Sequence, residues 1–305
     1  MIPKPTMTAR VREYLTRRRA VGYQRYREGR QLLNFARYAA ETPHRGPLTA
    51  ALALRGATLP PAADPASHAR RLNIVRVFAR HQAVLDPATQ IPPRHVLGPA
   101  FRRKTPHLFT ARQLHQLLQR SGGLSGPLRS MTFRTLLGLL ISTGLRISEA
   151  LALTVPDVNL RQGVLTVRGS KFGHARLVPL HPSALSPLRR YARQRARGFP
   201  QAQAFFVSER GQRLRYGSVH RVFVGLSQDM QPTKGRRQVR LHDLRHHFAC
   251  RVLRRWQRSR RGVAGRVVML ARYLGHIHLR DTYWYLSAVP ELLKQAAGRF
   301  LPPPP

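Results

Sequence analysis

The sequence predicts a mainly α-helical protein with a small antiparallel β-sheet, an α+β fold. Apolar residues recur at helical spacing in segments 7–41 and 66–85, which indicates a helical N-terminal domain. A proline-rich, aperiodic stretch follows at 86–108 and is typical of a connection between domains. Beyond it, helical patterns flank one group of short β-prone runs at 157–180, so the second domain combines helices with a small sheet.

The N-terminal helices each have one apolar stripe that predicts a buried face. Segment 7–41 is expected to form two helices and segment 66–85 a third. We expect Arg70, Arg76 and Arg80 on the solvent-facing side of the third helix. The three stripes are Val11, Tyr14 and Leu15; Leu32, Leu33, Phe35 and Tyr38; and Leu72, Val75, Phe78 and Ala79.

The elements after the connection are predicted from caps and glycine stops. Thr110 is a plausible N-cap for a helix that carries the run ARQLHQLLQR. A long apolar helix should end at Gly144, and a second helix should open at Leu145. Gly163 and the segment 169–174 break the β-prone run into three strands, and the remaining chain returns to helices.

These changes of pattern define the expected domains. Residues 1–100 form the first domain, and residues 101–108 form a basic, proline-containing linker. Residues 109–305 form the second domain, which ends with a C-terminal helix and a proline tail. The apolar side of that last helix is Leu292, Leu293, Ala296 and Ala297.

The charge balance points to a polyanionic partner. The chain has 54 Lys and Arg, all but five of them Arg, against 12 Asp and Glu, a formal net charge of +42. Such an excess destabilises a compact chain by self-repulsion unless a polyanion compensates it. A GC-rich genome would explain the choice of Arg over Lys but not the scarcity of acids. Because arginines bind phosphates bidentately, we expect nucleic acid as the partner.

The remaining composition suggests an intracellular protein. The single cysteine, Cys250, excludes an intramolecular disulfide and is expected in a reducing cytoplasm. No apolar run approaches the roughly 18 residues of a membrane span. The N-terminal residues also lack the apolar core of a signal peptide.

Two cations stand beside glycines in positions that could fix them. Arg146 follows the glycine stop, where it is either solvated or held inward by Glu149 three residues later. Lys171 stands at the predicted tip of a hairpin. A tip lysine is usually solvated, but one that enters a DNA groove could donate a proton to a leaving alkoxide.

The run LHDLRHHFACRVLRRW places two more candidates near the start of a helix. His242 and Arg245 are three residues apart and so project from neighbouring positions. The alternative is a zinc site, because His242 and His246 have the spacing of the ligands in a zincin helix. That motif needs glutamate as its second residue, whereas Asp243 stands here, and Arg245 would repel the metal.

Two tyrosines lie close together in the run LGHIHLRDTYWYL, after His276. A turn at Gly275 should precede a helix that carries Tyr283 and Tyr285. Residues two apart on a helix diverge by about 200°. At most one of the two phenols can therefore face a given site.

Together these candidates suit phosphoryl transfer without a metal ion. Arginines bind the non-bridging oxygens and stabilise charge that develops in the transition state. A phenol attacks phosphorus, a histidine handles its proton and a lysine protonates the departing oxygen. Metal-dependent nucleases need convergent carboxylates instead, and the 12 acidic residues form no obvious cluster in the sequence.

The motifs resemble those of the tyrosine recombinase (phage integrase) family over about residues 106–290. TGLRISEAL is similar to the first arginine box, GSKFGHARLVPL to the hairpin motif that ends in Arg-x-Val-Pro-Leu, and HDLRHHFA to the His-x-x-Arg box. In the family the nucleophile usually follows the histidine of LGH by nine residues, which selects Tyr285 over Tyr283. The implied catalytic set is Arg146, Lys171, His242, Arg245, His276 and Tyr285, with Glu149 in support.

The resemblance implies a site-specific recombinase of a phage or other mobile element. A helical core-binding domain and a catalytic domain would form a C-shaped clamp around duplex DNA. Cleavage would pass through a 3′-phosphotyrosine, and the chain would need no cofactor, metal or ATP. The expected assembly is a homotetramer on paired half-sites, with room for accessory directionality proteins and with the C-terminal helix docked on a neighbouring protomer. The expected location is the bacterial cytoplasm, in association with the nucleoid and with no membrane contact.

Other interpretations remain open at this point. A type IB topoisomerase-like enzyme shares the chemistry and would relax plasmids as a dilute monomer, without a specific site. A non-catalytic DNA-binding clamp would not need all six catalytic positions to carry the expected residue types. The C-terminal stretch could also be a local terminal helix without a docking role.

Overall fold

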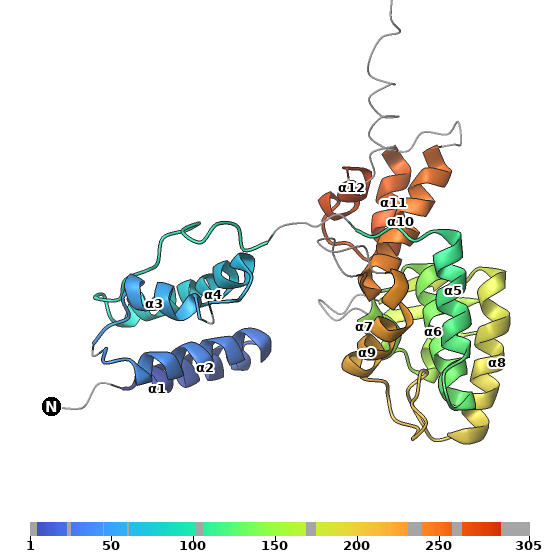
Figure 1. Cartoon of the computed structure of the whole chain (residues 1–305), viewed down its shortest axis with the longest axis horizontal. Helices are drawn as coiled ribbons and strands as arrows, with labels where there is room; N and C mark the ends of the chain where they lie inside the picture. Colours follow the sequence, from blue (N-terminus) through green and yellow to red (C-terminus); the bar gives the residue numbers. More distant parts are fainter. Residues whose placement is uncertain are drawn as a thin grey trace, which may run out of the picture. The chain divides into compact units, whose positions relative to one another are not determined.

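The computed structural model describes residues 5–22, 26–44, 46–59, 61–101, 106–168, 175–230, 239–257 and 264–287. The chain divides into two compact units, Met1–Lys104 and Thr105–Pro305 (Figure 1). The predicted fold class is confirmed, since the described residues are mostly helical with one three-stranded antiparallel sheet. Of the predicted linker, residues 102–105 lie outside the described part.

The first unit is built from helices that pack through their apolar stripes. The helices α1 and α2 lie side by side, and α3 packs on α4 (Figure 1). Thr6 and Thr49 cap α1 and α3 by accepting hydrogen bonds from backbone N–H groups in the first turn. The helices are α1 (Met7–Ala20), α2 (Tyr26–Glu41), α3 (Ala50–Ala57) and α4 (Pro65–Leu85). Their buried core includes Val11, Leu32, Phe35, Leu52, Leu72 and Phe78.

One predicted orientation in this unit is wrong. Arg76 was expected to face solvent, but its side chain is buried on α4. Its Nε donates to the carbonyl oxygen of Pro92 at 2.8 Å, and its Nη2 donates to that of Pro93. Pro92 and Pro93 lie in an irregular segment, where their carbonyl oxygens accept no helix or sheet hydrogen bonds. The buried guanidinium of Arg76 supplies the donors that these oxygens need. Arg76 thereby attaches the start of the connecting segment to α4.

The second unit has a helical layer and a small sheet. Thr110 caps α5 in a capping box, in which its Oγ1 accepts from the backbone N of Gln113 at 3.1 Å. The helices are α5 (Ala111–Gly122), α6 (Pro127–Thr143), α7 (Ile147–Ala152), α8 (Pro182–Gly198), α9 (Tyr216–Leu226), α10 (Leu241–Gln257), α11 (Ala264–Leu274) and α12 (Arg280–Ser287). Two short 3-10 helices span Val155–Asp157 and Gln228–Met230.

The sheet has the order β1 (Val158–Asn159), β2 (Val164–Arg168) and β3 (Ala175–Pro179), all antiparallel. Leu165 pairs with Val178, and both are buried. Two positions further along the register, Val167 lies opposite Arg176. Because side chains alternate along a strand, Arg176 lies on the same face as buried Val178, while Leu177 between them is exposed.

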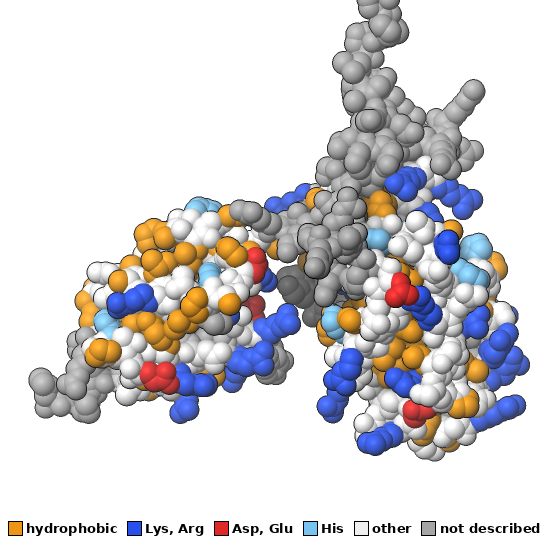
Figure 2. Space-filling model, in the orientation of Figure 1, with side chains coloured by type: hydrophobic (Ala, Val, Ile, Leu, Met, Phe, Trp, Pro, Cys, Tyr) orange, Lys and Arg blue, Asp and Glu red, His pale blue; other side chains and the backbone are white. Residues whose placement is uncertain are grey.

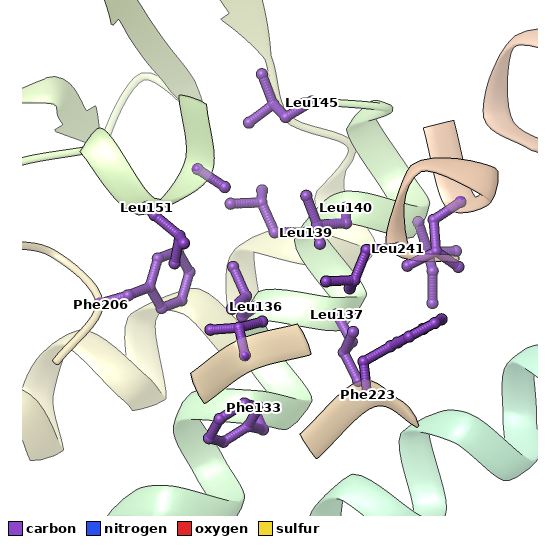
Figure 3. Packing of buried hydrophobic residues seen from close by; sticks show 14 of the residues in the cluster. Phe133, Leu136, Leu137, Leu139, Leu140, Leu145, Leu151, Phe206, Phe223 and Leu241 are labelled. Carbon is purple, nitrogen blue, oxygen red and sulfur yellow. The ribbon is translucent and has the colours of Figure 1, made fainter. Parts of the chain in front are cut away.

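Helix α6 forms the centre of the second unit. It packs against α5, α8 and α10, and Figure 3 shows its leucines gathered with Phe206, Phe223 and Leu241. A separate cluster joins the last helices, in which Phe248, Leu253, Val267, Leu270 and Tyr285 are buried together. Since α12 contacts both α10 and α11, this second cluster fixes the helix that carries the two tyrosines. Among the described residues, no helix is long and apolar enough to cross a membrane.

Candidate active site

The turn after α6 brings the first arginine to the start of α7. Gly144 has a φ of +64°, and a Cβ there would clash with the ring of Phe248. The position therefore needs glycine for its backbone conformation and for the close approach. Two residues later Arg146 is the N-cap of α7, where it donates from Nη1 to Glu149 Oε1 at 2.8 Å and from Nη2 to Gly275 O at 3.1 Å.

The second arginine of the predicted set lies in the same place. Arg245 is buried on α10 and donates from Nη1 to Gly144 O at 2.9 Å and from Nη2 to Leu274 O at 2.6 Å. Its Nη1 is also 3.9 Å from Glu149 Oε2. Burial and the nearby Arg146 charge lower the pKa of Arg245 to about 10, which leaves it protonated at neutral pH.

A third arginine, which the sequence reasoning did not include, completes the cluster. Arg176 of β3 donates to both carboxylate oxygens of Glu149, at 3.1 and 2.8 Å, and from Nε to Tyr273 O at 2.8 Å. Burial alone would raise the pKa of Glu149, but hydrogen bonds from Arg176 and Arg146 outweigh it and lower the pKa to about 2. Glu149 therefore stays ionised.

The three arginines also share the end of one helix. The carbonyls of Tyr273, Leu274 and Gly275 are consecutive at the C-terminus of α11, and they accept from Arg176, Arg245 and Arg146 respectively. Carbonyls at a helix C-terminus have no helical partner and carry partial negative charge. The helix end and Glu149 thus hold three guanidinium groups together, and the positive charge of this arginine cluster exceeds the single carboxylate charge.

The residues after that helix end include the second predicted histidine and the predicted nucleophile. The Nδ1 atom of His276 is 2.7 Å from Thr282 Oγ1, at hydrogen-bond distance. The His276 ring stacks on the ring of Tyr285, with 5.9 Å between the two centroids. Tyr285 is only 2% exposed, whereas Tyr283 is 48% exposed. Burial raises the pKa of Tyr285, and the charge and hydrogen bond of Arg245 oppose that rise. The two phenols diverge as the helical geometry predicts.

Two histidines of α10 extend this group of aromatic rings. The rings of His242 and His246 are 4.6 Å apart, and that of His246 is 5.4 Å from Tyr285. The sequence suggests only a zinc-ligand role for His246, yet its ring is buried against the phenol, and its Nδ1 has no hydrogen-bond partner among the described residues. Within the described residues, no group of three His, Cys, Asp or Glu side chains could hold a metal ion.

The structure therefore brings together every described member of the predicted set. They are Arg146, Glu149, His242, Arg245, His276 and Tyr285, linked by the contacts above. Lys171 lies outside the described residues, as do the predicted C-terminal docking residues and the proline tail. Arg176 was missed although it is the arginine of the Arg-x-Val-Pro-Leu ending, because that ending served only to align Lys171.

The buried histidines predict a loss of stability in mild acid. Burial, followed by nearby positive charges, lowers the pKa of His246 to about 3 and that of His276 to about 4. The unfolded chain takes up these protons near pH 6.5, and the folded chain only near pH 3 for His246 and pH 4 for His276. The neutral histidines therefore contribute fully to the free energy of unfolding above pH 6.5, the pKa in the unfolded chain. That contribution is lost as the pH falls toward the lower pKa values of the folded chain. Urea unfolding should give a lower free energy of unfolding at pH 5.0 than at pH 7.5.

The His246→Gln variant isolates the contribution of one such group. It keeps a polar side chain but cannot take up a proton, so its free energy of unfolding should change less between the two pH values. An equal pH dependence in the variant and the parent chain would contradict the buried, neutral state of His246.

Comparison with known proteins agrees with this geometry. Residues 107–291 match the Phage integrase family. The protein y4rB of Sinorhizobium fredii, named for the integrase/recombinase class, is 40% identical over 309 residues and covers 96% of each chain. The tyrosine recombinase XerD of Mycobacterium tuberculosis is 33% identical over 239 residues, which is 75% of this chain and 72% of that protein.

Solved structures share the fold. The Tn1549 transposon integrase in complex with transposon right end DNA aligns with a TM-score of 0.69 at 15% identity, over 95% of this chain and 98% of that chain. The XerH site-specific recombinase bound to a palindromic difH substrate gives 0.68 at 16% identity, over 95% and 84%. The chain therefore belongs to the phage integrase family, the tyrosine-type site-specific recombinases.

Proposed function

We propose that this chain cuts and rejoins double-stranded DNA at specific sites through a covalent bond between Tyr285 and a 3′-phosphate, as the integrase of a mobile element. The observation that carries the proposal is the position of Tyr285. Its ring is buried against Arg245 and His276, beside the arginine cluster, while the neighbouring Tyr283 is exposed. The imidazoles of His246 and His276 lie beside the ring of Tyr285, and the charges of Arg245 and Arg146 act on its phenol.

The arginine cluster suits a phosphodiester. A scissile phosphate carries one negative charge and develops more on its non-bridging oxygens as the nucleophile approaches. Arg146 is partly exposed and has guanidinium N–H groups beyond those given to Glu149 and Gly275. Arg245 is buried and preorganised by two carbonyls. We assign both as the groups that bind the phosphate oxygens.

Proton transfer completes the reaction. The Tyr285 oxygen attacks phosphorus, the 3′-phosphotyrosine bond forms and the bond to the 5′-oxygen breaks. Because its pKa is raised, the phenol is neutral and must lose its proton to a base. Burial and nearby arginines lower the pKa of His242 and of His276 to about 4, so either imidazole is neutral and can accept it. We assign Lys171 to protonate the leaving 5′-oxygen. A later 5′-hydroxyl reverses these steps.

Bond energy is conserved in the phosphotyrosine ester, so we expect strand exchange without ATP. The arginine cluster supplies the positive charge that would stabilise the phosphate in the transition state. Each proposed proton transfer also uses a side chain of this protein. A divalent ion is therefore not expected to be required.

Several features support DNA as the partner. Figure 2 shows many Lys and Arg side chains and few acidic ones on the visible face, in line with the formal charge of +42. In the first unit, the lining of a cavity of about 630 Å³ beside α1, α2 and α4 includes one acid, Glu28, and five arginines, Arg18, Arg19, Arg27, Arg30 and Arg70. Such a cluster suits contacts to the phosphate backbone. We propose that this unit is the core-binding domain.

We further propose that the chain acts as a tetramer on two DNA sites. A similar structure is that of a lambda integrase tetramer bound to a Holliday junction, with a TM-score of 0.62 at 17% identity over 90% of this chain and 76% of that chain. Exchange between two duplexes needs four cleavage events, one for each strand. A tetramer supplies one Tyr285 for each of them.

The test is strand exchange between two DNA molecules. The binding site is first selected from a library of random duplexes with the cleavage-deficient Tyr285→Phe variant. Two labelled duplexes that carry the selected site are then incubated with the full chain in EDTA and without ATP. We expect recombinant duplexes. Relaxation of a plasmid that lacks the site, by dilute chain and without exchange, would instead indicate a topoisomerase-like enzyme and overturn the proposal.

A further inference from the structure

We propose that Arg176 is a positioning residue for strand cleavage, because it holds Glu149 and the end of α11 where they aim Arg146 and place His276. The inference rests on the proposed function and deepens it. Arg176 itself is not expected to touch the DNA, and its effect passes through the groups that it binds.

The contacts of Arg176 are all directed into the protein. The two ends of its guanidinium bind the two oxygens of Glu149, at 3.1 and 2.8 Å, and Nε binds Tyr273 O at 2.8 Å. Its side chain is 19% exposed. The backbone of Gly275 also lies against it, since a Cβ at that position would be 2.8 Å from Nη1. The planar group is therefore enclosed on its bonding edges and on one side.

Glu149 connects Arg176 to the arginine that we assign to the phosphate. Its Oε1 accepts from both Arg176 and Arg146, and its Oε2 accepts from Arg176 and from the backbone N of Arg146. With both oxygens shared, the carboxylate cannot rotate toward one partner. Without Arg176, Glu149 would pair with Arg146 alone and draw its guanidinium away from a bound phosphate.

The second connection runs through the end of α11. Tyr273 O, which Arg176 binds, is three residues before His276. The next two carbonyls, of Leu274 and Gly275, bind Arg245 and Arg146. Gly275 has a φ of +66°, so the chain turns sharply there before His276. By holding the last helical turn, Arg176 fixes the point from which His276 reaches Tyr285.

Only an arginine fits this role. Bidentate pairing with a carboxylate needs the planar fork of a guanidinium, and the third donor, Nε, points along the side chain toward a different acceptor. A lysine has the charge but presents a single nitrogen. It could hold one Glu149 oxygen or the Tyr273 carbonyl, but not both oxygens and the carbonyl together.

The experiment compares Arg176→Gln, Arg176→Lys, Glu149→Gln and the double variant Arg176→Gln/Glu149→Gln. Each full-length chain is measured for DNA affinity and for the single-turnover rate of adduct formation on a nicked duplex that carries the selected site, with DNA in excess. The control is Arg189→Gln on α8, which removes the same single positive charge. Arg189 is exposed and, like Arg176, donates to a backbone carbonyl, Leu160 O at 2.9 Å.

We expect Arg176→Gln to reduce the adduct rate by about 100-fold, the cost of a small misplacement of catalytic groups. DNA affinity should stay close to that of the Arg189→Gln control. Because Arg176 acts partly through Glu149, the double variant should lose less than the product of the two single losses. Arg176→Lys should recover only part of the rate.

An adduct rate equal to that of the parent chain in Arg176→Gln or Arg176→Lys would overturn the proposal. So would a double variant whose loss of rate equals the product of the two single losses. If Arg176→Gln does not fold, the adduct rates of Arg176→Lys and of Glu149→Gln still test the proposal, because each removes part of the contact between Arg176 and Glu149. Failure of the proposed function would look different, because the parent chain itself would then form no adduct.

Discussion

Tyr285→Phe is expected to abolish covalent protein–DNA adducts while DNA binding persists. The change removes one hydroxyl from a buried ring and keeps the packing with His276 and the cluster of Phe248, Leu253 and Val267. Without the phenol oxygen no phosphotyrosine can form, so the adduct rate should fall by at least about 10⁴-fold. The measurement is gel separation of denatured adducts on a nicked duplex, with affinity from a filter-binding titration.

The neighbouring phenol is the matched control. Tyr283 is on the same helix and 48% exposed, so Tyr283→Phe should form adducts at the rate of the parent chain. If Tyr283→Phe loses the adduct and Tyr285→Phe keeps it, the assignment of the nucleophile is wrong. That result would also require α12 to turn by about half a revolution on DNA, because the two positions diverge by about 200°.

Arg146→Lys is expected to reduce adduct formation by about 100- to 1000-fold, the loss that follows removal of one preorganised donor to a developing oxyanion. A lysine keeps the charge but loses the fork that reaches Glu149 and Gly275 O together and that we propose also binds a phosphate oxygen. Single-turnover rates at saturating DNA isolate this effect from binding. Arg245 is a poorer target, because its burial would combine catalytic loss with destabilisation.

Arg120→Lys is a close control for this change. Arg120 is 36% exposed, against 37% for Arg146, and likewise donates to one carboxylate, Asp229, and one backbone carbonyl, Leu226 O. It belongs to α5 and pairs with Asp229 of the 3-10 helix Gln228–Met230, and its contacts with Leu226 and Asp229 lie outside the arginine cluster. We expect its adduct rate to match that of the parent chain. Equal losses in Arg146→Lys and Arg120→Lys would mean that the Arg146 effect is a general cost of removing an arginine.

Local patterns predicted the parts of the fold and site that depend on nearby residues. Thr110 was recognised as a cap, and Gly144 as a stop, because both act within one turn of the chain. The Arg146–Glu149 pair is three residues apart and was weighed from that spacing. The divergence of Tyr283 and Tyr285 follows from helix geometry alone.

Contacts between distant segments could not be predicted in this way. Arg176 is one arginine among 54 basic residues, and its partners, Glu149 and Tyr273, come from other elements. Arg76 was placed on the solvent side by periodicity, but Pro92 and Pro93 fold back over that side of α4. Helix α3 was not predicted, since its eight residues are too few for a clear repeat. The role of Lys171 stays a prediction.

The most direct measurement asks which atom of the protein becomes bonded to DNA. The full chain is trapped on a nicked duplex carrying its selected site, in EDTA, then digested with protease and nuclease and analysed by mass spectrometry. We expect a nucleotide, joined through its 3′-phosphate, on the peptide that contains Tyr285. A nucleotide on another residue, or cut DNA that requires a divalent metal and carries no peptide, would contradict the account.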